Sequence, residues 1–153
     1  MTPHDDPDHV GRQLPLTASI RPDAPAPLID EAMIRTLVDT FYEDVRDDPT
    51  LGPIFARHVA DWSLHLPKMY DFWSTVVLRT GRYAGRPFES HQRLPGLTAE
   101  DFARWLDLWR HTVARVAPEA ARAAFTVPAE RMAANMSAAL LRGGPAKSYG
   151  SQF

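Results

Sequence analysis

Apolar residues recur at three- and four-residue steps along most of residues 28–142. In the first run, over residues 29–45, they fall on one helical face, and polar residues occupy the other. Asp30 is predicted to cap the start of this helix. Asp48-Pro49 is predicted to end it, because the residue before a proline disfavours the α region. The apolar stripe consists of Ile29, Met33, Ile34, Leu37, Val38, Phe41, Tyr42 and Val45.

A second periodic run follows a tight corner expected at residues 51–55. It predicts a helix from near Asp61 or Ser63 to about Thr80. One stripe of this helix carries His65, Met69, Trp73 and Val76. Pro67 lies inside the run, where a proline removes a hydrogen bond and clashes one turn back. The sequence therefore predicts either a start near His65 or kinked first turns.

The C-terminal half predicts two further helices. Thr98 and Asp101 have the spacing of a capping box at the start of the first, although Asp101 replaces the usual Glu or Gln. Its buried stripe is expected to comprise Phe102, Trp105, Leu106, Trp109, Thr112, Val113 and Val116. The second runs over about residues 118–141, with a break or kink expected at Pro128. Residues 81–87 are predicted to be a loop. No run predicts a strand, so the expected fold class is all-α.

Prolines mark where the folded unit is expected to begin. Six of the 14 prolines fall in residues 1–27, which contain few aromatic residues. Such a segment buries too little surface to offset the entropy of ordering, so residues 1–27 are expected to form a flexible extension. The glycine-rich residues 143–153 are expected to be a frayed tail. The prediction is one domain over residues 28–142, which suits a 153-residue chain.

Charge and composition exclude several classes of function. The chain has 17 Lys and Arg against 19 Asp and Glu, which indicates neither nucleic-acid binding nor attraction to acidic membranes. Because it has no cysteine, disulfides, thiolate catalysis and Cys-based metal sites are excluded. No apolar run approaches the roughly 20 residues of a membrane span. The first residues lack the pattern of a secretory signal, so the expected location is cytoplasmic.

The predicted interior combines apolar side chains with an unusual share of polar aromatic groups. Periodicity places there Tyr42, His65, Trp73, Trp105 and Trp109. His91 lies in a short segment between prolines. This composition is ordinary for a ligand pocket. The sequence contains no zinc-helix, nucleophile-elbow or phosphate-loop motif. A single imidazole remains able to hold a haem iron, because the porphyrin supplies the other four in-plane donors.

Seven short strings occur in order along the chain. They are Phe41-Tyr42-Glu43-Asp44-Val45-Arg46, Leu51-Gly52-Pro53-Ile54-Phe55, Trp62-Ser63-Leu64-His65, Phe72-Trp73, Gly81-Arg82-Tyr83-Ala84-Gly85-Arg86-Pro87, His91-Gln92-Arg93-Leu94 and Phe102-Ala103-Arg104-Trp105-Leu106. Together they resemble the third group of truncated haemoglobins over about residues 28–142. The chain departs from that family in its proline-rich extension and in Pro67. The resemblance implies a globin-like, truncated two-over-two helical sandwich.

The resemblance also implies the roles of the site residues. His91 would be the proximal ligand of the iron of haem b. Tyr42 and Trp105 would form hydrogen bonds with a bound diatomic gas (oxygen, nitric oxide or carbon monoxide), and His65 would occupy the distal-helix position. The remaining haem contacts would be Phe55, Lys68, Met69, Trp73 and Arg93. The implied function is reversible oxygen binding, or binding of another diatomic gas, with a reductant that the sequence does not identify.

Alternative interpretations stay open at this point. Tyr42, Trp105 and Trp109 are also compatible with plain core packing, and His65 with a ring that faces solvent or gates the pocket. Lys68 also fits an ordinary surface lysine. A second function class is an enzyme for nitric oxide dioxygenation or a peroxidase-like reaction. A third is a cofactor-free helical module whose proline-rich arm binds a partner.

Overall fold

The computed structural model describes residues 28–85 and 96–142. These two ranges contain helices and no strand, so the all-α prediction is confirmed. The helices are α1 (Glu31–Asp47), α2 (Leu51–His58), α3 (Trp62–Leu78), α5 (Ala99–Val116) and α6 (Glu119–Leu141). The predicted extension at 1–27 and tail at 143–153 lie outside the described residues. So do His91 and Arg93.

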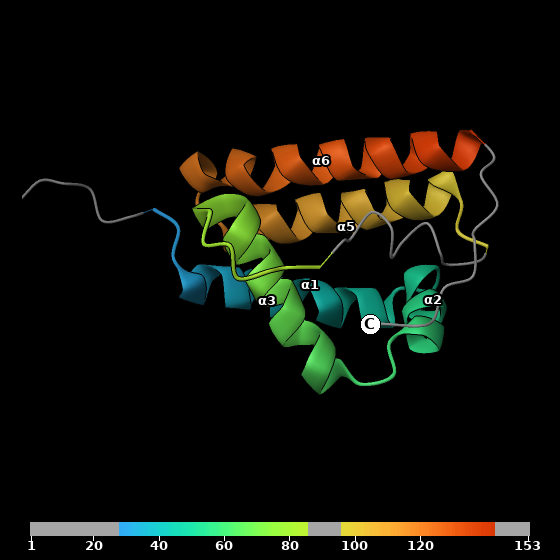
Figure 1. The fold of residues 1–153 in the computed structure, drawn as a ribbon, viewed down its shortest axis with the longest axis horizontal. Helices are drawn as coiled ribbons and strands as arrows, with labels where there is room; N and C mark the ends of the chain where they lie inside the picture. The colour runs from blue at the N-terminus through green and yellow to red at the C-terminus, as the bar shows by residue number, and fades with distance from the viewer. Residues whose placement is uncertain (1–27, 86–95, 143–153) are drawn as a thin grey trace, which may run out of the picture.

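The helices form two packed pairs (Figure 1). In one pair, α5 and α6 run antiparallel along their whole length. In the other, α3 crosses α1 obliquely, and α1 also packs along α5. The short helix α2 lies at the C-terminal end of α1. The pair α1 and α3 therefore covers the pair α5 and α6, as predicted for a two-over-two sandwich.

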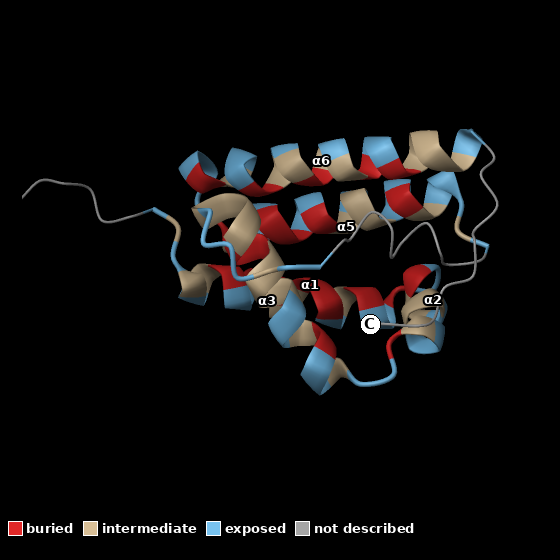
Figure 2. Ribbon diagram, viewed as in Figure 1, coloured by how far each residue is buried: buried red, intermediate tan, exposed pale blue. Residues whose placement is uncertain are grey.

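The core lies where the buried faces of α1, α3, α5 and α6 meet (Figure 2). Trp109 and Phe125 are completely buried at its centre, and Phe41 is 1% exposed. The indole Nε1 of Trp109 donates a hydrogen bond to the backbone oxygen of Phe125 at 3.0 Å. Because a buried indole needs such a partner, this bond allows Trp109 to fill the middle of the core. No helix within the described ranges combines the length and the apolar character needed to cross a membrane.

The predicted caps are confirmed. Asp30 accepts a hydrogen bond from the backbone N–H of Met33 at 2.8 Å and so caps α1. Asp48 ends that helix with extended backbone at ψ 127°. Thr98 and Asp101 form the reciprocal capping box at the start of α5. The caps at Asp30 and Thr98 satisfy backbone N–H groups that a helix start otherwise leaves without partners.

One local prediction was wrong. Residues 51–55 begin helix α2 instead of forming a simple corner, because Pro53 lies in its first turn, where no backbone N–H is needed. Helix α3 begins at Trp62, as predicted by a start near Asp61 or Ser63, and it runs through Pro67, so the alternative of a start near His65 does not hold. Helix α6 runs through Pro128 without a break. The carbonyls one turn before these two prolines belong to the exposed residues Ser63 and Ala124, so water can satisfy them.

Candidate functional site

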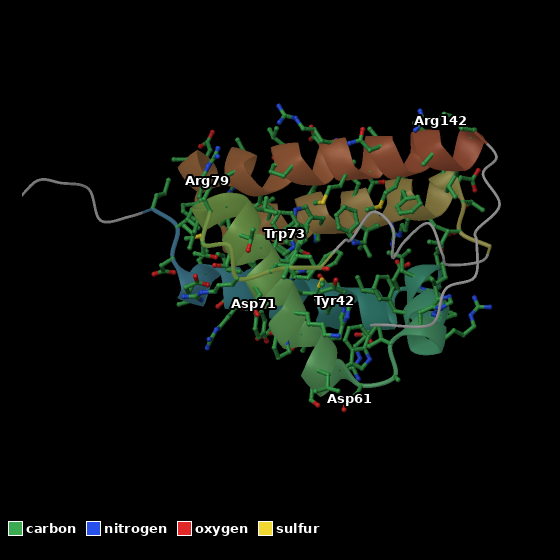
Figure 3. All side chains as sticks on the ribbon, in the orientation of Figure 1. Tyr42, Asp61, Asp71, Trp73, Arg79 and Arg142 are labelled. Carbon is green, nitrogen blue, oxygen red and sulfur yellow. The ribbon has the colours of Figure 1, made fainter. Side chains whose placement is uncertain are left out.

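The candidate site begins with a tyrosine hydroxyl in the apolar interior. Tyr42 lies on the buried face of α1 and is only 7% exposed (Figure 3). A phenol is protonated at neutral pH, and burial raises the pKa of Tyr42 further above the ordinary value, so the hydroxyl is a donor. Within the described part of the chain, no residue forms a hydrogen bond with it. The hydroxyl of this buried ring is therefore available to a ligand.

Three aromatic rings from two other helices surround Tyr42. The centroid of its ring lies 5.8 Å from that of Phe55, 5.4 Å from that of Trp62 and 5.4 Å from that of His65. Phe55 belongs to α2, and the other two belong to the first turns of α3. We call Tyr42, Phe55, Trp62 and His65 the distal cluster. It lies where α1, α2 and α3 converge.

His65 is held inside this cluster. It is 6% exposed, and its ring stands edge-on to Tyr42 at 84° and to Trp62 at 87°. Its backbone N–H donates to the Asp61 carbonyl at 3.1 Å, and the Asp61 side chain caps α3 through Ser63 at 2.8 Å. The cap fixes where α3 starts and thus which residue reaches Tyr42. In this conformation the imidazole is in the interior and does not face solvent.

Trp105 joins the site through Phe41. The Phe41 ring lies 5.0 Å from Tyr42 on its own helix and 5.9 Å from Trp105 on α5, edge-on in both contacts. Trp105 is half-buried, whereas Phe41 is 1% exposed. Phe41 therefore sets the spacing between the two predicted distal donors.

Trp73 lies apart from the distal cluster. It is 3% exposed, and its ring stacks on Trp109 with centroids 4.3 Å apart and planes 15° apart. The ring of Trp105, one turn earlier on α5, lies parallel to that of Trp109 with the centroids 6.2 Å apart. The structure thus places Trp73 in the tryptophan packing of the core. Its predicted role in contacting haem stays a prediction.

The structure places the other predicted haem contacts in different surroundings. Phe55 is in the distal cluster, and Met69 is half-buried against the main core. Lys68 is exposed on α3, which is compatible with the alternative of an ordinary surface lysine. The predicted ligand His91 and its neighbour Arg93 are outside the described residues, so the structure brings neither to the site.

Sequence reasoning missed two ring residues of this region. Trp62 was noted only within a matching string, although it precedes His65 by three residues and so shares its helix face. Phe41 was assigned to an apolar stripe without a role. Spacing alone contained the signal for Trp62, whereas the position of Phe41 between α1 and α5 depends on tertiary packing.

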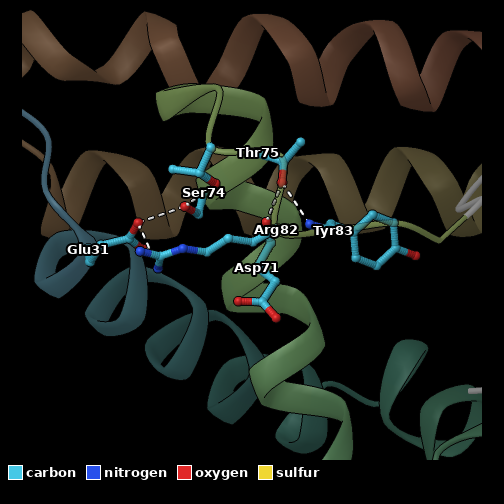
Figure 4. A network of polar contacts seen from close by, with 7 residues as sticks. Glu31, Asp71, Ser74, Thr75, Arg82 and Tyr83 are labelled. Atoms are coloured by element: carbon cyan, nitrogen blue, oxygen red, sulfur yellow. Dashed lines mark hydrogen bonds and ion pairs between the residues drawn. The ribbon is translucent and has the colours of Figure 1, made fainter.

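Polar ties fix α3 against α1 (Figure 4). The hydroxyl of the fully buried Ser74 donates to the Glu31 carboxylate at 2.7 Å, and the Arg82 guanidinium lies 3.1 Å from the same oxygen. Further along the crossing, the Tyr70 hydroxyl donates to Asp39. These contacts hold the C-terminal half of α3 on α1 and thereby limit how far Tyr42 and His65 can separate.

The described residues contain no group of three or more His, Asp or Glu side chains placed to hold a metal ion. The candidate site instead offers the Tyr42 hydroxyl, the His65 imidazole and the half-buried Trp105 indole among apolar rings. These are single donors in a low-dielectric surrounding, an arrangement typical of a pocket for a small, weakly polar ligand.

Comparison with known proteins identifies the family. No protein-family model matches the chain. The chain is 36% identical over 89 residues to the group 3 truncated hemoglobin ctb of Campylobacter jejuni, covering 56% of this chain and 70% of that protein. Its fold is similar to the crystal structure of group III truncated hemoglobin from Campylobacter jejuni, with a TM-score of 0.70, 33% identity, and coverage of 76% of this chain and 95% of that one.

Both comparisons agree with the fold and with the predicted resemblance. The sequence match covers 70% of the relative's length, and the structural match covers 95% of the solved chain. The helical arrangement is accordingly globin-like. The chain belongs to the group III truncated haemoglobins.

Proposed function

We propose that this chain binds one haem b and uses it to bind a diatomic gas reversibly, with oxygen as the principal ligand. Membership of the truncated haemoglobins supports the proposal at the level of family. The observation that carries it is the Tyr42 hydroxyl: a donor 7% exposed and without a hydrogen-bond partner among the described residues. A hydroxyl on a buried ring that makes no hydrogen bond with the described residues is able to donate to a ligand, which fits a site that receives one.

The residues present are compatible with haem. The group needs an apolar, aromatic-walled space and a side chain that holds its iron, and the distal cluster supplies such a wall beside Tyr42. His91 would be the residue that holds the iron. Phe55, Lys68, Met69, Trp73 and Arg93 would make the remaining contacts. When bound, haem supplies an iron at which diatomic gases bind.

The distal residues act as hydrogen-bond donors toward such a gas. A fixed hydrogen-bond donor in a low-dielectric space would stabilise a diatomic ligand that carries partial negative charge. Tyr42 is a donor at neutral pH, because a phenol is protonated there and burial only raises its pKa further. The Trp105 indole can only donate, whereas the Tyr42 hydroxyl can donate or accept. Together they favour oxygen over the less polar carbon monoxide.

An absorption spectrum tests this function. Hemin is titrated into the purified full chain, the sample is reduced, and carbon monoxide is added. We expect saturation at one haem per chain, with a sharp band that shifts on reduction and again with carbon monoxide. His91→Ala is expected to lose tight haem retention, whereas His111→Ala, an exposed histidine on α5, is expected to retain it. A chain that stays colourless after hemin is offered would refute the proposal, and normal retention by His91→Ala would refute the axial assignment.

A further inference from the structure

Trp62 contacts all three other rings of the distal cluster, and the proposed function gives it no role. Its ring centroid lies 5.4 Å from that of Tyr42, 5.5 Å from that of His65 and 6.3 Å from that of Phe55. It is the first residue of α3 and is half-buried against the main core. One indole therefore borders each of the other three rings of the cluster.

The contact angles restrain both polar rings. The plane of His65 stands at 87° to Trp62 and at 84° to Tyr42, so each imidazole contact is edge-on. Trp62 itself is tilted by 58° against Tyr42. Edge-on and tilted aromatic contacts favour particular ring orientations, because the positive edge of one ring meets the negative face of another. Rotation of either polar ring would have to break a contact with Trp62.

Trp62 is held in turn by a cation from α1. The Arg46 guanidinium carbon lies 5.0 Å from the centroid of the indole. Arg46 follows Tyr42 by four residues, so both lie on one face of α1 and both reach Trp62. A guanidinium over an indole at this distance is a favourable cation–π contact. Arg46 and Tyr42, one turn apart on α1, thus both hold the indole in place.

We propose that Trp62 is a positioning residue of the distal site: its indole, anchored by Arg46, sets the orientation of the Tyr42 and His65 rings toward the ligand. This role rests on the proposed function, because it concerns a bound ligand. The ring contacts through which Trp62 acts are nevertheless present in the protein without haem. Trp62 donates nothing to the ligand. It acts through the direction in which the Tyr42 hydroxyl points.

The first readout follows the two rings directly. The full chain, with ¹³C-labelled tyrosine and histidine rings, is reduced and saturated with carbon monoxide, which leaves the sample diamagnetic with or without haem. A nuclear Overhauser contact between Tyr42 and His65 is expected in the wild type and in Trp62→Phe. We expect it to be lost in Trp62→Leu and weakened in Arg46→Gln. Leu64→Ala, an exposed neighbour 62% accessible, is the matched control and should keep it.

The second readout is the rate of oxygen release from the haem-loaded chain. Trp62→Leu is expected to release oxygen roughly 3- to 10-fold faster, the range that corresponds to losing one well-oriented aromatic contact. Arg46→Gln should show a smaller increase. Arg35→Gln removes a second guanidinium of α1, 5.7 Å from the Tyr70 ring, and should leave the rate unchanged.

The outcomes separate the two ideas. If no sample acquires a haem spectrum, the proposed function fails, and the Tyr42–His65 contact still decides the role of Trp62. If Trp62→Leu folds and keeps both the contact and the release rate, the positioning role is overturned, even if its melting temperature falls. Should Trp62→Leu not fold, Arg46→Gln decides the matter: an unchanged contact and an unchanged rate in that variant overturn the proposal.

Discussion

Replacing Asp48 by alanine is expected to separate three helices that one carboxylate now joins. Asp48 follows α1 directly, and its side chain is 2% exposed. One oxygen accepts the backbone N–H groups of Thr50 at 3.1 Å and Leu51 at 2.9 Å, at the start of α2. The other accepts the Nε–H of Arg104 on α5 at 2.9 Å. Asp48→Ala removes all these bonds at once.

The magnitude follows from the bonds lost. Loss of a side-chain cap costs about 1 kcal/mol. A hydrogen bond to a charged group contributes about 1.5–3 kcal/mol, and we take the low end because the Arg104 side chain is 45% exposed and water screens the pair. The free energy of unfolding of Asp48→Ala is therefore expected to be about 2–3 kcal/mol lower than that of the wild type.

Urea unfolding followed by far-UV circular dichroism measures this difference at neutral pH. Asp47→Ala is the matched control, because Asp47 is the exposed last residue of α1. Its charge is unfavourable at the helix C-terminus, so the control should change stability little or raise it slightly. Equal losses in the two variants would show that Asp48 makes no special contribution and would refute the reasoning.

The effect also has a predicted pH dependence. Burial pushes the pKa of Asp48 upward, but the hydrogen bond from Arg104, the backbone N–H groups of Leu51 and Thr50 and the Arg104 charge outweigh it and lower the pKa. A lowered pKa in the folded state gives stability that is present above the unfolded value of about 3.9 and lost as the pH falls below it. The difference between wild type and Asp48→Ala should thus shrink on acidification, and a constant difference would contradict the ion pair.

Three further variants test other contacts. Gly52→Ala should destabilise the fold by about 1–3 kcal/mol in denaturant unfolding, because its Cβ would meet the Arg46 backbone oxygen at 2.7 Å; a neutral variant would contradict this. Burial and then the hydrogen bond to Asp39 raise the pKa of Tyr70 to about 12, so its contribution is complete below pH 10.0 and fades toward 12. Unfolding measured across that interval should depend less on pH in Tyr70→Phe than in the wild type. Tyr42→Phe should release oxygen roughly 5- to 150-fold faster in stopped-flow measurements, and an unchanged rate would leave Tyr42 as packing only.

Periodicity predicted the helices whose burial is one-sided. The predicted stripe of α1 includes its fully packed positions Ile34, Leu37, Val38, Phe41, Tyr42 and Val45. The caps of α1 and α5 were also predictable, because a cap depends on residues only three apart. Local patterns determine such features almost completely, and tertiary contacts do not alter them.

The prolines show where local rules fail. Pro67 and Pro128 both lie within unbroken helices. A proline removes one backbone bond and crowds the preceding turn, but the packing of the rest of the helix can outweigh that cost. Whether it does depends on the burial of the preceding turn, which sequence spacing does not reveal.

The site was predictable residue by residue but not as an arrangement. His65 and Trp73 lie on one stripe of α3, and the sequence assigned both to the pocket. Because α3 crosses α1 obliquely, its first turns meet Tyr42, whereas Trp73 meets Trp109 and Phe125 of the other helix pair. A stripe shows which side of a helix is buried but not which helix covers each turn. The same limit hid Trp62, whose four partners come from three helices.

Tyr42 separates stability from function. The described residues form no hydrogen bond with its hydroxyl, so removing the hydroxyl breaks no bond of the fold. Tyr42→Phe should consequently change the free energy of unfolding of the haem-free chain by no more than about 0.5 kcal/mol, while it speeds gas release from the loaded chain. A tyrosine that served only packing would leave both quantities unchanged. A variant that is as stable as the wild type and yet a poorer binder would show that this hydroxyl is retained for its ligand.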